Sequence, residues 1–261
     1  MKVRNVKFVN LITKHMVVLP SAKLCSSRLR YKHIKNGQNI KRYYEIPSVR
    51  SSDYGQTVST SQRQPRVRNA GNLIPHSRHF VDEMTSCEPA GLELSCIVND
   101  IKHVIVCGHS DCKAMNLLYK LKSADESNLE QRRISPLKSW LCAHGKSSLN
   151  KFLDVKGDFN KPILFSAETP QRKFVAYIDP ENQFCIEDKL SQVNTLQQLQ
   201  NIASYGMLKK RLEKHDLHIH ALWFDIYTGD IYYFSRRAKR FLIIDEASYE
   251  VILAEIRRYY S

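Results

Sequence analysis

The residues best suited to chemistry in this 261-residue chain are His109 and Cys112, in the sequence CGHSDC at positions 107–112. A neutral imidazole and a thiolate are common ligands of catalytic zinc. The start of a helix favours the thiolate form of a cysteine, because backbone N–H groups and the positive end of the helix dipole lie close to it. The pair therefore predicts a zinc (Zn²⁺) site, although a His and a Cys at this spacing also occur in loops by chance.

The segments on either side of this pair are expected to place it at the edge of a sheet. Residues 103–108, HVIVCG, form a short β-branched run that ends in a glycine, which is typical of a buried strand. After HSDC, apolar residues at helical spacing continue from Ala114 to Leu121. Strand, loop and helix in this order indicate an α/β unit, and open α/β sheets bind ligands beyond the carboxyl ends of their strands. This context strengthens the prediction of a metal site.

The other periodic segments predict further helices and strands of the same α/β domain. In chain order they are a helix over 92–101, a hairpin over 174–188 with its turn at 180–183, a helix over 193–212, two strands over 217–236 that turn at 228–229, and a closing helix over 246–260.

Three longer motifs carry a resemblance to a known family. RNAGN at 68–72, SCEPAGLEL at 86–94 and HVIVCGHSDCKAMN at 103–116 resemble consecutive landmarks of the beta-class carbonic anhydrases. The resemblance runs from about Val67 to at least Ile244, and the C-terminal stretches are similar to the animal, mitochondrial-type members. It implies a mostly parallel sheet flanked by helices, a homodimer or higher oligomer, and zinc-dependent interconversion of carbon dioxide and bicarbonate. Zinc in such a site lowers the pKa of a bound water to about 7, which supplies a nucleophile at neutral pH.

One landmark of that family is missing. Its members take a first zinc ligand from a C-x-D-S-R segment on an earlier central strand, and the Asp and Arg of this segment form a dyad that orients the metal-bound water. The spacing would put this cysteine at position 46, which is Ile46. Catalytic residues therefore stay unassigned, and we expect the sheet to lack one central strand unless residues near Lys14 to Leu19 replace it. The alternative function is that of an impaired or inactive, dimer-forming relative.

The nearest imitation of the missing segment is CSSR, from Cys25 to Arg28, which follows the apolar run MVVLP. It lacks the Asp and lies about twice too far upstream, with a polar linker between it and the first motif. Cys25 is therefore a weak candidate for the third ligand.

The chain divides by composition into a basic head over 1–46, a Ser-, Thr- and Gln-rich linker over 47–66, and the resembling domain over 67–261. Most of the formal net charge of +14 lies in the head, whose first 44 residues contain eleven Lys and Arg and no Asp or Glu. Such a head is typical of a mitochondrial import signal, and the other interpretation is a disordered tail in a cytoplasmic protein, or a segment foreign to the working chain. It has no nucleic-acid-binding motif, and no apolar run approaches membrane-spanning length. We therefore expect neither nucleic acid nor a membrane as partner.

Seven cysteines at irregular spacing indicate free thiols in a reducing compartment. We expect Cys96, Cys107 and Cys185 to lie in the core because apolar residues surround them. A redox pair of Cys107 and Cys112 is disfavoured by the spacing. His218 and His220 alternate along a predicted strand, and they are better explained as half-buried sheet residues than as metal ligands.

Overall fold

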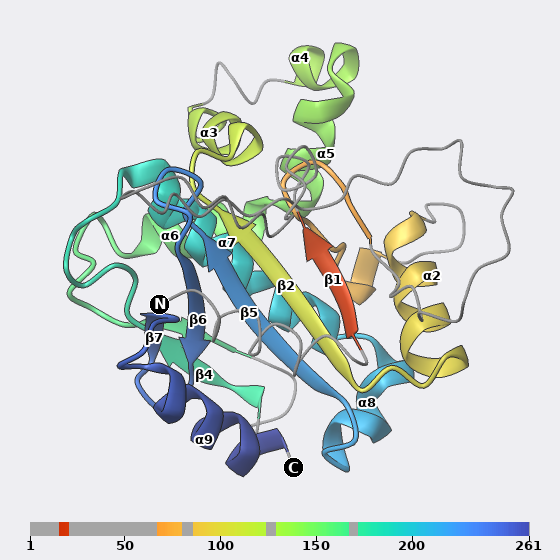
Figure 1. Ribbon diagram of the computed structural model, residues 1–261. Helices are drawn as coiled ribbons and strands as arrows, with labels where there is room; N and C mark the ends of the chain where they lie inside the picture. The colour runs from red at the N-terminus through yellow and green to blue at the C-terminus, as the bar shows by residue number, and fades with distance from the viewer. Residues whose placement is uncertain (1–15, 21–66, 80–85, 124–128, 167–171, 261) are drawn as a thin grey trace, which may run out of the picture.

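The computed structural model describes residues 16–20, 67–79, 86–123, 129–166 and 172–260 (Figure 1). The predicted α/β fold is confirmed. Within the described residues no helix combines the length and the apolar character needed to cross a membrane.

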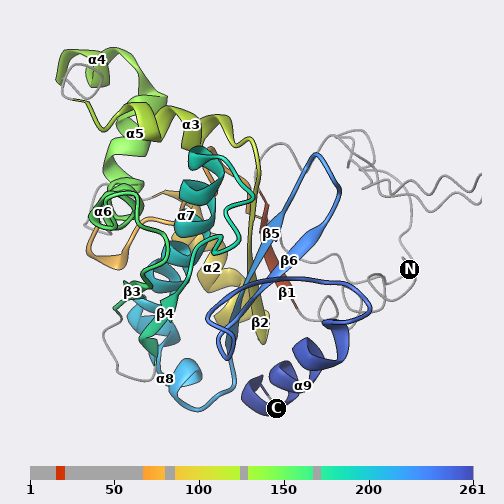
Figure 2. The same cartoon turned by 90° about the vertical axis from the view of Figure 1, so that its left-hand side faces the viewer.

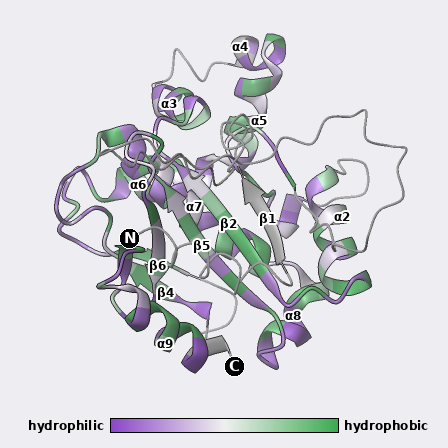
Figure 3. Cartoon of the chain, in the orientation of Figure 1, coloured by the Kyte–Doolittle hydropathy of each residue, from purple (hydrophilic) through white to green (hydrophobic). Residues whose placement is uncertain are grey.

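A five-stranded mixed sheet forms the centre of the molecule, with the strand order β1-β2-β5-β6-β7. Its strands are β1 (Met16–Pro20), β2 (His103–His109), β5 (His218–Phe224), β6 (Ile231–Ser235) and β7 (Arg240–Ile243). The first three strands pair in parallel, whereas β6 and β7 pair antiparallel to their neighbours. Figure 3 shows β2 as hydrophobic along most of its length, and Val104, Ile105 and Val106 are at most 1% exposed. This is the pattern of a strand covered on both faces.

Helices cover both faces of the sheet. They are α2 (Cys87–Glu93), α3 (Lys113–Lys120), α4 (Leu129–Ile134), α5 (Pro136–His144), α6 (Lys146–Asp154), α7 (Ile186–Ala203), α8 (Gly206–Glu213) and α9 (Tyr249–Tyr260), with a 3-10 turn η2 (Ser77–His79) and a π-helical turn η3 (Leu94–Val98). Figure 2 shows α7 against one face of the sheet and α9 beyond the other. The larger hydrophobic core lies on the α7 side and a smaller one on the α9 side.

The strand β1 lies where the sequence predicted a gap in the sheet. Its residues pair in parallel with β2, from Met16 opposite His103 to Pro20 opposite Cys107 (Figure 1). The expected loss of a central strand is therefore not confirmed, because a segment of the basic head borders β2 on its otherwise open side. Cys25 and Ile46 lie outside the described residues.

The helix α7 is buried on almost every side, from Asp188 to Ala203. It packs between β2 and β5 on one side and α6 on the other. The predicted single helix over 193–212 is wrong, because α7 ends at Ala203 and α8 begins at Gly206. Tyr205 between them has extended backbone angles, and its hydroxyl donates a hydrogen bond to the carbonyl of Pro75 at 2.7 Å.

The predicted hairpin over 174–188 is also wrong, because its first strand pairs with an earlier segment of the chain. Its first half is β4 (Phe174–Ala176), which pairs antiparallel with β3 (Ile163–Phe165) in a separate two-stranded sheet. The turn itself is present, since the carboxylate of Asp179 accepts the backbone N–H groups of Gln183 and Phe184 at 2.9 Å each. The chain after this turn enters α7 and forms no strand.

Three histidines meet on the α9 side of the sheet. His103 on β2 lies opposite His218 on β5, with ring centroids 5.1 Å apart, and its Nδ1 lies 3.1 Å from Nε2 of His220. His218 and His220 are sheet residues, as expected, but they are buried and not half-buried. The described residues contain no group of three ligand side chains that could hold a metal ion. Burial, and after it the charge of the neighbouring His103, lowers the pKa of His218 to about 4 and that of His220 well below 6.5.

Acidification should therefore destabilise the fold through His218. The unfolded chain binds a proton at this residue below pH 6.5, whereas the folded protein binds it only near pH 4, so the free energy of unfolding falls as the pH drops through this window. We expect His218→Gln to make the thermal unfolding midpoint less dependent on pH between 6.5 and 4, measured by circular dichroism. Lys210→Gln, at an exposed position on α8, is the control, because this lysine does not titrate between pH 6.5 and 4. An unchanged pH dependence in His218→Gln would contradict the assignment.

Candidate metal centre

The predicted ligand pair lies at the carboxyl end of β2, in the loop that leads into α3. His109 is the last residue of β2, and Cys112 is the N-cap residue of α3 with an extended backbone. Both side chains are buried, at 2% and 6% exposure. The predicted placement at the mouth of the sheet and the opening of a helix is thus present in the structure.

The imidazole of His109 is held in one orientation. Its Nδ1 lies 2.6 Å from the carbonyl oxygen of Ser110. A carbonyl can only accept, so Nδ1 carries the proton and Nε2 carries the lone pair that a metal requires. The backbone carbonyl of His109 accepts the hydroxyl of Ser191 on α7 at 2.7 Å, and Trp223 Nε1 donates to the same hydroxyl at 3.2 Å. The tautomer and the backbone of this residue are both fixed by neighbours.

Ser110 ties the loop to the end of β5. Its N–H donates to the carbonyl of Phe224 at 2.9 Å, and its hydroxyl donates to Asp225 Oδ1 at 2.9 Å while accepting from the N–H of Ile226. The Asp225 carboxylate also accepts the hydroxyl of Thr228 at 3.0 Å. The loop that carries the ligand pair therefore moves only if the β5–β6 turn moves with it.

Asp111 has a left-handed backbone, with φ of 50°, between the two ligand residues. Its N–H donates to Asp188 Oδ1 at 2.6 Å, and its carboxylate pairs with Lys113 Nζ at 2.6 Å. Burial raises the pKa of Asp188, and the nearby carboxylates of Asp225 and Asp111 raise it further. This acidic side of the loop attracts cations, and the hydrogen bond that Asp111 donates to Asp188 holds the strained residue in place.

The two cysteines of CGHSDC lie in different cores. Cys112 packs in the larger core on the α7 side, whereas Cys107 packs with Ile105 and Ile252 on the α9 side. Burial raises the pKa of the Cys107 thiol to about 12, so this thiol is protonated and unreactive. Both are free thiols. The disfavoured redox pair thus has no support in the structure.

The RNAGN segment packs directly behind Cys112. Gly71, with φ of 81°, approaches α3 so closely that an added Cβ would lie 3.1 Å from Met115 Cε and 3.4 Å from Ala114 Cβ. Asn69 closes the turn by accepting the N–H of Leu73 at 2.9 Å, and its amide donates to Glu88 in α2 at 2.8 Å. The three motifs of the sequence are thereby brought together around the start of α3.

Amide side chains on α7 form hydrogen bonds with the backbone of residues 71–74. Asn194 donates to the carbonyl of Gly71 at 2.9 Å, Gln198 accepts the N–H of Ile74 at 2.8 Å, and Asn201 donates to the carbonyl of Ile74 at 2.8 Å. Buried amides of this kind satisfy backbone groups that would otherwise lose their hydrogen bonds to water.

The donor set fits a zinc ion only in part. His109 and Cys112 are the right residue types, and the imidazole tautomer is suitable. No group of three or more His, Cys, Asp or Glu side chains that could hold a metal occurs in the described part of the chain. The structure therefore offers two ligands, and a third has to come from outside these residues.

Sequence reasoning missed several residues that position the site. Asp188 was placed at the end of the predicted hairpin, and Ser191 lies before the predicted helix. Asn194 lies in the segment read for its apolar spacing, and the unusual number of polar residues on α7 was the available signal. Cys185 was expected in the core and is exposed. It precedes α7 as the N-cap, which places it at the surface end of the helix.

Comparisons with known proteins agree on one family. The family model described as carbonic anhydrase matches residues 66–231. Beta carbonic anhydrase 1 of Caenorhabditis elegans is 43% identical over 198 residues, which cover 74% of this chain and 72% of the relative. A carbonic anhydrase of Synechocystis is 28% identical over 165 residues, covering 63% of this chain and 48% of the relative. The solved beta-carbonic anhydrase CcaA has a TM-score of 0.55 at 19% identity, covering 93% of this chain and 83% of its own, and shows the shared fold.

The glycine before His109 provides a test of how α7 and β2 position the loop. A Cβ at Gly108 would lie 2.0 Å from Thr195 Oγ1 on α7. We expect Gly108→Ala to destabilise the protein by about 1–3 kcal/mol, as overpacked core substitutions do. Adding Thr195→Ala should restore part of this loss, measured by urea unfolding. If the two single variants lose unfolding free energy and these losses simply add in the double variant, the contact between residue 108 and Thr195 does not limit the packing.

Proposed function

The chain belongs to the beta class of the carbonic anhydrase family, and on that premise we propose that it catalyses the reversible hydration of carbon dioxide to bicarbonate and a proton. We propose that zinc is the cofactor and that His109 and Cys112 are two of its ligands. Zinc, when bound, makes a water molecule nucleophilic at neutral pH.

The observation that carries the proposal is the fixed geometry of His109. Its Nδ1 proton is committed to the carbonyl of Ser110, and its backbone is held by Ser191. Such outer contacts orient a ligating imidazole and raise its basicity. A histidine that served only the core would not need its ring to be fixed at the end of a strand beside the N-cap cysteine of a helix.

The residues around His109 and Cys112 hold the loop between β2 and α3 in place and exclude water from one side of it. Ser110 and Asp225 are buried at 0% and 6% exposure, so bulk water has no route through the β5 side of the loop. On the α7 side, Asp188 holds the backbone of Asp111. These contacts set the separation of the two ligands without help from a metal, which lowers the ordering cost of binding one.

A second candidate function is supported by the incomplete ligand set. With two ligands in the described residues and no Asp–Arg dyad, the chain would be an impaired or inactive relative that keeps the fold. The parallel pairing of β1 with β2 bears on this choice, because the chain leaves Pro20 at the same edge of the sheet that carries His109. Cys25 follows five residues later. We keep it as the candidate third ligand, to be tested directly.

We also propose a homodimer. Leu94, Ile97 and Val98 on η3 are 54%, 42% and 68% exposed, and grouped apolar residues of this kind are typical of protein interfaces. Light scattering that reports a single chain in solution would contradict this.

Import into mitochondria is the proposed localisation, supported by the basic head, whose first 44 residues contain no Asp or Glu. A fluorescent protein fused to residues 1–46 that stays in the cytoplasm would contradict it, and would favour a cytoplasmic enzyme.

The metal centre is tested by zinc content and by carbon dioxide hydration in the full chain. We expect wild-type protein to hold close to one zinc per chain and to be active, whereas His109→Ala and Cys112→Ala should lower the metal affinity by more than about tenfold. His215→Ala and Cys87→Ala change exposed residues of the same types and should keep both properties. Zinc retention in His109→Ala equal to that of wild type would rule out the proposed ligand pair.

The same measurements separate the two candidate functions. Weak zinc binding and no hydration activity in the wild-type chain would favour the inactive relative. Loss of zinc in Cys25→Ala would identify the third ligand, and unchanged zinc content would exclude this cysteine.

A further inference from the structure

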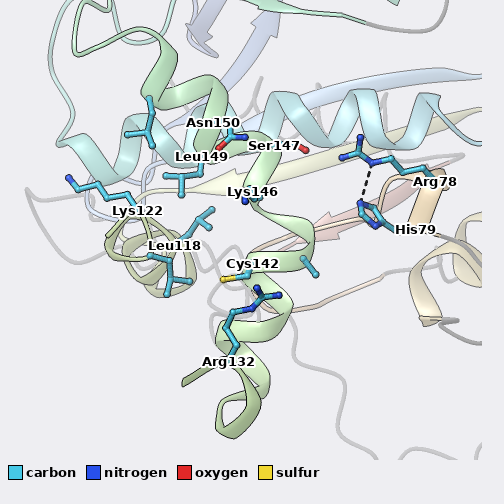
Figure 4. Close-up of a pocket in the computed structure, with 13 residues that line it drawn as sticks. Arg78, His79, Leu118, Lys122, Arg132, Cys142, Lys146, Ser147, Leu149 and Asn150 are labelled. Carbon is cyan, nitrogen blue, oxygen red and sulfur yellow. Dashed lines mark hydrogen bonds between the residues drawn. The ribbon is translucent and has the colours of Figure 1, made fainter. Parts of the chain in front are cut away.

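A cavity of about 650 Å³ lies away from the metal centre, between η2, α5 and α6 and the C-terminal end of α3 (Figure 4). Figure 4 shows Arg78 and His79 on its right-hand side, Arg132 below and Lys122 at its left-hand edge, around Lys146. Its volume is typical of small-molecule sites, which range from about 300 to 1,000 Å³.

The charged residues that line this cavity are all basic. Arg78, Lys122, Arg132 and Lys146 come from four different segments, and no Asp or Glu of the described residues lines the space. Within the described residues none of the four forms an ion pair. Four cations around one cavity repel one another, so a bound anion would reduce this repulsion.

Two further groups point to an anion. The Nε atom of Arg132 is buried and has no hydrogen-bond partner, which is unfavourable for a guanidinium N–H unless a ligand accepts it. Lys146 is the first residue of α6, a nine-residue helix whose N-cap, Gly145, offers no side-chain cap. Gly145 is also the C-cap of α5, so the ends of the two helices meet there, and Lys146 contributes its own charge.

The opposite wall of the cavity is apolar. Leu118, Leu121 and Leu149 line it and are buried in the hydrophobic core. An inorganic ion would leave this wall in contact with water. A ligand that combines an anionic group with an organic body would use both walls, because burial of its apolar part adds to the electrostatic attraction.

We propose that this cavity binds a small organic phosphate, with the phosphate held by Arg132, Lys146 and Arg78 and the organic part against the leucine wall. The site is separate from the metal ligands and does not depend on the proposed catalytic activity. Bicarbonate, with one charge and four heavy atoms, is too small to contact both walls.

The binding test uses the full chain and four probes: adenosine monophosphate, glucose 6-phosphate, inorganic phosphate and adenosine. We expect at least one organic phosphate to bind with a dissociation constant below 1 mM by calorimetry, more tightly than inorganic phosphate, and adenosine not to bind. Arg132→Gln and Lys146→Gln should each weaken binding by about tenfold or more, as expected for loss of a charge-assisted hydrogen bond. Lys210→Gln, an exposed cation on α8, is the matched control and should bind like wild type.

Absence of binding by both organic phosphates, or equal affinities in wild type and both pocket variants, would overturn the proposal. Binding of inorganic phosphate as tight as that of the organic phosphates would overturn the role of the leucine wall. His109→Ala should bind the organic phosphate like wild type, so failure of this site and failure of the metal centre give different results.

Cys142 offers a second readout within the cavity. Its thiol lines the space, whereas Cys185 is exposed elsewhere. Bound organic phosphate should slow alkylation of Cys142 several-fold and leave Cys185 unchanged, measured by mass spectrometry. Equal rates at Cys142 with and without the ligand would place the ligand elsewhere and contradict the proposal.

Discussion

The close contact between α7 and the end of β2 is the constraint on which the rest of the structure depends. Only a residue without a side chain fits at Gly108, because Thr195 of α7 occupies the space. This approach lets Ser191 reach the carbonyl of His109 and lets Asp188 reach the N–H of Asp111. The amide side chains of the same helix bind the RNAGN segment. A single buried helix therefore positions both the loop that carries the ligand pair and the segment that packs against α3.

As a result of this arrangement, α7 carries many polar side chains inside the core. Asn194, Gln198 and Asn201 are matched, but the Oε1 atoms of Gln192, Gln197 and Gln200 have no partner within the described residues. Hydrogen-bonded amides specify one register between helix and loop, whereas an apolar helix could slide. The polar content of α7 thus fits a role in positioning.

The sequence predicted the parts of the fold that depend on local pattern. The strand before His109, the helix after Cys112 and the paired strands β5 and β6 follow from periodicity and turn residues, and the structure contains all three. The long-range choices were not accessible in this way. The pairing of β4 with β3 depends on which strand edges remain unpaired after the core is packed. Residues near Lys14 to Leu19 were named as a substitute strand, but their pattern alone did not decide that Met16–Pro20 pairs with β2. The contacts of Asp188 and Ser191 were missed because they depend on how closely two elements approach.

The order of the strands has a consequence for synthesis of the chain. The strand β1 leaves the ribosome first, but its partner β2 is separated from it by residues 21–102. At a synthesis rate of about 5–20 residues per second, β2 is made about 4 to 16 s after β1. During this interval the nascent chain presents an apolar segment without a sheet to join, and chaperones that hold extended chains have their longest opportunity to act on it.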